Sequence, residues 1–137
     1  MFTVPLATNR YVTVVSTGYA YDGGAHGRHF TVAVTYDLKR AKPVLLKDIF
    51  AEGSSWSDNL ALRAIAKAGA NPERPAALEN ARKVVSDPAN WTLLAEGAQL
   101  TFPEYSIAPY ADGEPVAVFT WEELRPYLKT EAPIPLR

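Results

Sequence analysis

The sequence predicts an α+β fold, a single domain over residues 1–137 in which a twisted antiparallel β-sheet carries two main helices on one face. The first and last thirds of the chain are rich in β-branched and aromatic residues, which favour strands. The middle third instead repeats apolar residues at helical spacing. With 137 residues, 47% of them hydrophobic, the chain is long enough to bury one core.

The first predicted strands, at 11–21 and 29–37, flank a glycine-rich loop at 22–28, an order typical of an antiparallel hairpin. Alternate residues of the second strand are apolar and fall on one face of the sheet: Phe30, Val32, Val34 and Tyr36. A polar turn at 39–43 follows, and a short strand is predicted at 44–46.

Two helices are predicted in the middle of the chain. The first begins among the N-cap candidates at 54–58 and ends at Gly69, and its apolar positions are Leu60, Ala61, Ala64, Ile65 and Ala68. The second begins near Pro75 and ends before Pro88, with an apolar stripe at Leu78, Ala81, Val84 and Val85. Because each helix has one apolar face, both should lie against the sheet.

The last third returns to strands. Strands are predicted at 91–94 and 100–102, joined by a turn at 95–98, and another at 116–119 follows the loop at 103–113.

Near the C-terminus the sequence predicts a short helix and then a tail. Thr120 and Glu123 have the spacing of a capping box, which begins a helix, and Pro126 should limit that helix to a turn or two. Residues 130–137 are predicted to form an extended tail.

Composition excludes several classes of function. A formal net charge of −1 does not favour nucleic-acid binding, and no apolar run is long enough to span a bilayer. The absence of cysteine excludes disulfides, thiolate metal sites and a cysteine nucleophile. Residues 1–5 lack the basic and apolar regions of a signal peptide, and one interpretation is that Met1 lies inside a longer precursor.

The loop at 21–27 is the first candidate recognition element, because binding residues often lie on loops held by a rigid scaffold. Its glycines Gly23, Gly24 and Gly27 can take positive φ, which favours a sharp chain reversal that presents His26. His26 then either contacts a partner or caps backbone groups within the turn. We expect no metal here, because His26 and His29 match no ligand spacing and lack a third strong ligand.

The loop at 103–113 is the second candidate. Pro103 and Pro109 stiffen it, which lowers the entropy lost on binding, and Tyr105 and Tyr110 are of the type enriched at binding hot spots. The alternative is that the tyrosines anchor the loop to the core, and we expect this of one of the two. Trp56 and Trp121 are expected to be packing residues.

Nothing in the sequence favours an enzyme or a cofactor site. No phosphate-binding loop, dinucleotide fingerprint or serine-nucleophile motif is present. Asp48, Glu104 and Asp112 are candidates for an acid–base pair acting on a glycan, but nothing in the sequence places two of them together.

Four motifs together resemble one family. They are Tyr-x-Gly-Gly-Ala-His-Gly at 21–27, Leu-x-Asp-Ile-Phe at 46–50, Asn-Trp at 90–91 and Tyr-x-Ile-Ala-Pro-Tyr-Ala-x-Gly at 105–113. In this order they resemble the RsiV C-terminal domain, and the resemblance covers about 11–129. Trp91 stands where that family more often has phenylalanine.

The resemblance implies an extracytoplasmic domain, periplasmic or extracellular in the bacterial cell envelope. The best understood member of that family is an anti-sigma factor whose outer domain binds lysozyme, and other members are fused to a peptidoglycan deacetylase. This chain has neither a sigma-binding segment nor a deacetylase motif, so neither of those roles is carried over.

We therefore expect a non-catalytic binding module that recognises lysozyme or another cell-wall-associated protein through the two loops. The predicted binding residues are Tyr21, Gly23, Gly24, His26, Pro103, Tyr105, Pro109 and Tyr110. The first alternative is an accessory domain that binds peptidoglycan fragments for a cell-wall enzyme. The second is a purely structural domain.

Overall fold

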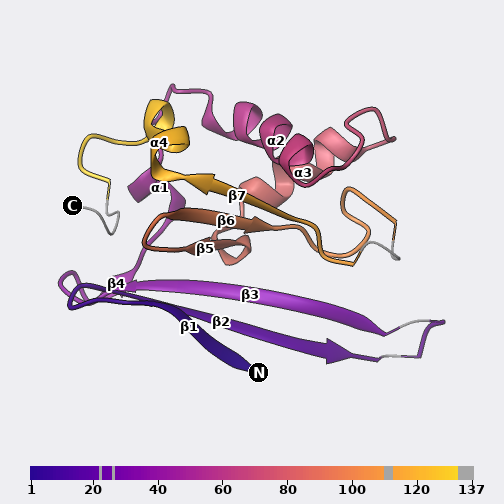
Figure 1. Cartoon of the computed structure of the whole chain (residues 1–137), viewed down its shortest axis with the longest axis horizontal. Coiled ribbons are helices and arrows are strands. Elements are labelled where there is room, and N and C mark those ends of the chain that lie inside the picture. The colour runs from indigo at the N-terminus through magenta and orange to yellow at the C-terminus, as the bar shows by residue number, and fades with distance from the viewer. Residues whose placement is uncertain (22, 26, 110–112, 133–137) are drawn as a thin grey trace.

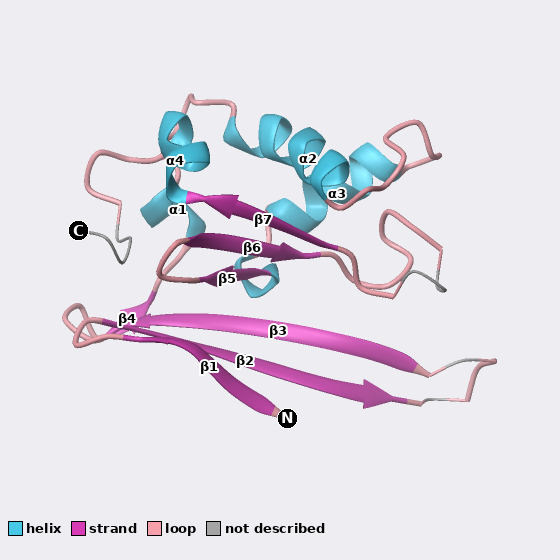
Figure 2. Cartoon of the chain, in the orientation of Figure 1, coloured by secondary structure: helices cyan, strands magenta, loops and turns pink. Residues whose placement is uncertain are grey.

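The computed structural model describes residues 1–21, 23–25, 27–109 and 113–132 as three stacked layers (Figure 1). Helices form the first layer, a three-stranded sheet the second and a four-stranded sheet the third (Figure 2). Strands and helices thus occupy separate layers, and this confirms the α+β class. The strands divide between two antiparallel sheets, whereas a single sheet was expected.

The four-stranded sheet is built on the predicted hairpin. Its strands are β1 (Phe2–Ala7), β2 (Tyr11–Ala20), β3 (Arg28–Asp37) and β4 (Lys42–Pro43), in that spatial order. Strands β2 and β3 pair over ten residues each, from Tyr11 opposite Asp37 to Ala20 opposite Arg28. The hairpin prediction is confirmed.

The three-stranded sheet lies between the hairpin and the helices. It contains β5 (Trp91–Leu93), β6 (Gly97–Thr101) and β7 (Val116–Thr120), with β6 in the centre. Strand β5 lies over the inner face of the hairpin and pairs along its edge with β6, so the two sheets stack face to face.

Helices α2 (Trp56–Lys67) and α3 (Ala77–Val85) cover the other face of the three-stranded sheet, as predicted. The core between them is completely closed to solvent. Its largest fully buried side chains include Leu60 and Ile65 from α2 and Leu100, Phe102 and Phe119 from the sheet and its connections.

One local prediction was wrong. Residues 44–46 do not form a strand; Leu46 begins the short helix α1 (Leu46–Ile49). The Asp48 carboxylate accepts a hydrogen bond from the Leu45 backbone N–H at 2.9 Å, which caps the first turn of this helix. Because Leu46 and Ile49 then fall on one side of the turn, both are buried in the core.

The C-terminal prediction is confirmed. Thr120 and Glu123 exchange the two hydrogen bonds of a capping box, at 3.0 and 3.1 Å, at the start of α4 (Trp121–Leu124). Two short 3₁₀ elements also occur in the described chain: η1 (Pro88–Asn90) precedes β5, and η3 (Arg125–Tyr127) follows α4. Most of the predicted tail lies outside the described residues.

The two tryptophans at helix starts are packing residues, as expected. Trp56 stacks on Phe50 with ring centroids 4.5 Å apart. Trp121 is buried, and its indole N–H donates to the Ala95 carbonyl oxygen at 3.1 Å.

The two faces of the hairpin differ in polarity. Its inner face buries Thr13 and Thr35, whose hydroxyls lie 2.8 Å apart and satisfy each other. The alternation predicted for β3 is confirmed, but its apolar side, which includes Val32 and Val34, is on the outer face and is exposed to solvent.

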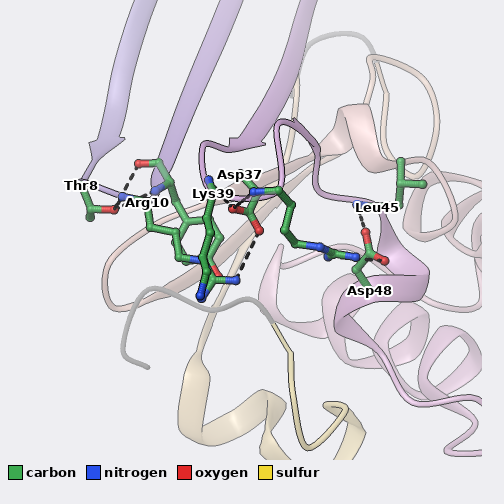
Figure 3. Close-up of polar contacts among 8 residues, drawn as sticks. Thr8, Arg10, Asp37, Lys39, Leu45 and Asp48 are labelled. Carbon is green, nitrogen blue, oxygen red and sulfur yellow. Dashed lines mark hydrogen bonds and ion pairs between the residues drawn. The ribbon is translucent and has the colours of Figure 1, made fainter.

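A buried carboxylate joins the turns at one end of the four-stranded sheet (Figure 3). Asp37 accepts hydrogen bonds from the backbone N–H groups of Lys39, at 3.0 Å, and Arg40, at 3.2 Å. The Arg10 guanidinium lies 3.4 Å from its other oxygen. Burial raises the pKa of Asp37, but the hydrogen bonds from Arg40, Arg10 and Lys39 and the charge of Arg10 outweigh it, so the pKa is lowered.

Because the pKa of Asp37 is lower in the folded chain than in the unfolded one, its ionisation stabilises the fold above the unfolded pKa of ~3.9. This stabilisation is lost as pH falls through the folded pKa. We expect Asp37→Asn to lower the free energy of unfolding at pH 7 by ~1–3 kcal/mol, and to flatten its loss in acid. Urea unfolding from pH 7 to pH 2 measures both effects.

Asp58→Asn is the control, because Asp58 is well exposed in its ion pair with Arg82 and should contribute little. If wild type and Asp37→Asn lost stability in acid with the same slope, the role given to Asp37 would be wrong.

Candidate binding cleft between two loops

The two predicted loops lie at the same end of the molecule (Figure 1). The paired strands β2 and β3 extend beyond the three-stranded sheet and carry the first loop with them. The second loop connects the end of β6 to the start of β7 on that same side.

A cleft of about 520 Å³ separates the loops. Residues from the first loop and the adjoining end of β3 form one wall, and residues from the start of the second loop form the other. The lining residues are Ala25, Gly27, Arg28, His29, Phe30, Thr31, Pro103, Glu104 and Tyr105.

A histidine–glutamate pair joins the two walls. Nδ1 of His29 lies 2.7 Å from Oε1 of Glu104, and the His29 backbone N–H donates to the same oxygen at 3.2 Å. Because a carboxylate only accepts, Nδ1 carries the proton, and Nε2 is the ring nitrogen turned away from the pair. The Glu104 side chain is 4% exposed and that of His29 is 56% exposed. Glu104 therefore holds an exposed imidazole in a fixed position.

The other carboxylate oxygen of Glu104 has no partner. Oε2 is buried and accepts no hydrogen bond from any of the residues that the structure describes. A buried acceptor without a partner costs free energy, and such groups are rare in folded proteins. The orientation of Glu104 therefore carries a free-energy cost.

Tyr19 supports the histidine from the neighbouring strand. It lies opposite His29 in the hairpin, with ring centroids 5.0 Å apart. A β-carbon at Gly27 would overlap the Tyr19 ring and hydroxyl, so only glycine permits this close approach. The first loop is thus shaped around the Tyr19 side chain.

The second loop is anchored at several points. The Thr31 hydroxyl donates to Glu114 at 3.0 Å, and the Asn80 side chain of α3 donates to the Ser106 carbonyl oxygen at 2.8 Å. Ile107 and Ala108 are buried, the first of them in the core. Directly before these anchors, Tyr105 has a positive φ of 67° and is 55% exposed. A non-glycine residue in this conformation is strained, and the strain is borne at the cleft wall.

The predicted binding residues are distributed unevenly around the cleft. Pro103 and Tyr105 line it, whereas Tyr21, Gly23, Gly24 and Pro109 are not among its lining residues. The Tyr21 hydroxyl donates to the Gly24 carbonyl oxygen at 2.8 Å within the hairpin loop. His26 and Tyr110 lie outside the described residues. The assignment of these residues to a binding site remains a prediction.

The pairing of His29 with Glu104 was not predicted from the sequence. His29 was considered as a metal ligand and Glu104 as an acid or base, each without the other. Strand alternation could have placed His29 on the inner face beside Tyr19, but its partner is 75 residues away in the chain. No local pattern joins two residues so far apart.

The described residues offer little support for a catalytic or metal site. They contain no cluster of three or more histidine and carboxylate side chains that could hold a metal ion. Asp48 and Glu104 do not pair, because Asp48 lines a separate polar pocket with Arg10 and Arg40, and Asp112 lies outside the described residues.

Comparison with known families shows which family the chain matches. The sequence profile of a family described as "Protein of unknown function (DUF3298)" matches residues 47–122, more than half of the chain. The chain belongs to the DUF3298 family. The matched range includes the second loop but begins after the hairpin, so the first loop lies outside it. None of the curated proteins matches the chain in sequence.

Two solved DUF3298 structures are similar to this domain. A member from Bacteroides fragilis NCTC 9343 has a TM-score of 0.73 and 23% identity, covering 95% of this chain and 53% of its own. A member from Pseudomonas aeruginosa PAO1 has a TM-score of 0.64 and 22% identity, covering 96% of this chain and 62% of its own. At this identity the likeness shows the shared fold alone, and the chain spans between half and two thirds of the length of each relative.

Removing the Glu104 carboxylate, which joins the two walls of the cleft, should lower the stability of the fold. We expect Glu104→Ala to lower the free energy of unfolding by ~1–2 kcal/mol, because two hydrogen bonds between distant segments are lost. Urea denaturation measures the loss, and NMR of the His29 side chain should show a change in its surroundings.

Glu79→Ala is the matched control. Glu79 is also a glutamate in an ion pair, but it is exposed on α3, and its removal should change stability by less than ~0.5 kcal/mol. Equal effects of the two substitutions would contradict the joining role of Glu104.

Proposed function

We propose that this DUF3298 domain is a non-catalytic, extracytoplasmic module that binds lysozyme or another cell-wall-associated protein in the cleft between its two loops. The observation that carries this proposal is the fixed pair of His29 and Glu104, which joins the loops and presents an imidazole beside the exposed Tyr105.

The cleft combines features that favour protein recognition. Tyr105 offers a large ring with a polar tip, and Pro103 beside it is stiff. The His29 side chain is held by Glu104 behind it, so less conformational entropy is lost when a partner binds. A rigid aromatic beside a fixed hydrogen-bonding group is a typical anchor for a partner's side chain.

The charge of the cleft favours an acidic group on the partner. Arg28 and His29 are neighbours on one wall, and the Glu104 carboxylate beside them is almost completely buried. Lysozymes cleave glycans with two carboxylates in an open cleft, which a protruding hairpin of this kind would complement. The sequence resemblance to the RsiV C-terminal domain, a family with a lysozyme-binding member, also supports this partner and an extracytoplasmic location.

The lining of the cleft supports binding rather than catalysis. A histidine oriented by a carboxylate can act as a general base, but it then needs a nucleophile or a substrate within reach. No serine or cysteine is among the described residues that line the cleft, and the Thr31 hydroxyl donates to Glu114. No helix among the described residues has the length and apolar character to cross a membrane.

Titration with a c-type lysozyme tests the proposal. Calorimetry should show saturable one-to-one binding, and lysis of a cell-wall substrate should fall as the domain is added. Absence of heat and of inhibition at ~100 µM would exclude this partner, because it limits any dissociation constant to values above about 100 µM. Retention of the domain on purified peptidoglycan would then favour the alternative accessory role.

Substitutions in the cleft wall test where lysozyme binds. We expect His29→Ala and Tyr105→Ala each to weaken lysozyme binding by ~1–3 kcal/mol, because both remove an anchor from the cleft wall. Leu62→Ala is the control for Tyr105→Ala, since Leu62 is 53% exposed but lies on α2, away from the cleft. If all three variants bound alike, the cleft would not be the binding site.

A further inference from the structure

The outer face of the four-stranded sheet is an exposed apolar surface. We call it the outer apolar face and define it by Phe2, Val12, Val14, Val32, Val34 and Tyr36. These residues lie on three adjacent strands and point away from the rest of the molecule, because their strand neighbours point inward. Phe30 extends this surface by covering Gly18 on the next strand.

This arrangement is unusual for a sheet that faces water. An antiparallel sheet with one solvated face normally alternates between apolar residues inward and polar residues outward. Here Val32 and Val34 are exposed, whereas Thr13 and Thr35 are buried on the inner face. Arg28, at the hairpin end, is the one charged residue among the outward positions of the described strands β2 and β3. A contiguous apolar surface of this kind is typical of an interface.

The outer apolar face is independent of the cleft. The cleft is built on the inner side of the hairpin, where His29 and Tyr19 meet the second loop. Val32 and Val34 point to the opposite side. Phe30, which extends the face, also lines the cleft, but the six residues that define the face do not, so a partner in the cleft leaves those six uncovered.

We propose that a second copy of this chain covers the outer apolar face in solution, forming a two-fold dimer by sheet-on-sheet packing. A two-fold interface brings the same surface of each copy together, so that surface must be complementary to itself. A face without charge at its centre meets this condition, because no like charges are opposed. A net charge of −1 on each copy adds little repulsion.

The area of the face is sufficient for a dimer. With Phe30 included, the exposed parts of these residues sum to roughly 500 Å² per copy, or about 1,000 Å² in total, which is the lower limit for a specific interface. Two sheets can pack face to face about 10 Å apart with their strands nearly aligned. A small polar ligand fits less well, since Ser16, which lies between Phe2 and Val32 on the described face, offers a single hydroxyl to orient one.

Sedimentation velocity on the full chain, from ~1 to ~200 µM, tests the proposal. The mass should rise with concentration from 15.0 kDa towards twice that value. A chain that remained at the monomer mass throughout would overturn the proposal, because it limits any self-association to dissociation constants above ~200 µM.

A matched pair of substitutions locates the interface. Val34→Glu should raise the dimer dissociation constant more than about thirtyfold, because it buries a carboxylate against its own copy. Val118→Glu is the control: Val34 and Val118 are 49% and 50% exposed strand valines, but Val118 lies in the other sheet. A Val34→Glu variant that dimerised as tightly as wild type would overturn the assignment of the face.

A second measurement avoids adding a charge to the sheet. The chain has no cysteine, so Val34→Cys and Val118→Cys each carry a unique thiol. In the dimer the thiol of Val34→Cys should react with a maleimide several-fold more slowly at ~200 µM than at ~1 µM, while that of Val118→Cys should not change. Equal reactivity of Val34→Cys at both concentrations would contradict the proposal.

Discussion

The three-stranded sheet has to be covered on both faces, and the rest of the fold is arranged around that requirement. One face presents large apolar residues such as Leu100 and Phe119, and the helices α2 and α3 cover it. The other face is more polar, with Thr92 and Thr101 both buried; the hairpin of β2 and β3 covers it on the β5 side and leaves Val116 and Val118 of β7 exposed. Because the covering hairpin is much longer than the strands beneath it, one end projects past the core. That projection creates the candidate site.

The cleft is a consequence of this difference in length. The projecting end of the hairpin would have no support on its inner side without the connection from β6 to β7. Glu104 and Glu114 of that connection hold His29 and Thr31 of β3, so the two segments support each other. The cost of this support is visible at Tyr105, with its positive φ, and at the unpartnered oxygen of Glu104. Strain at a solvent-facing cleft supports binding there as the role of these residues.

The same requirement explains the outer apolar face. Only one face of the hairpin is needed to cover the three-stranded sheet, and that face is the less apolar one, since it carries the bonded pair of Thr13 and Thr35. The valines of β3 are left on the far side. Most of the cleft and the outer apolar face therefore lie on opposite sides of the same two strands, so the proposed dimer would leave both of its clefts open.

The sequence by itself determined the local structure of this protein. Alternation in 29–37 predicted β3, the spacing from Leu60 to Ala68 predicted α2, and Thr120 with Glu123 predicted the start of α4, because each depends on neighbours a few residues apart. The segment 44–46 was misjudged, since its three apolar residues suit a strand and only the Asp48 cap and the burial of Leu46 favour a helix. Only the tertiary structure decided how the strands divide between two sheets, which side of the hairpin faces water and that Glu104 meets His29. These features depend on contacts between segments far apart in the chain, and the free energy of such contacts leaves no trace in a local pattern.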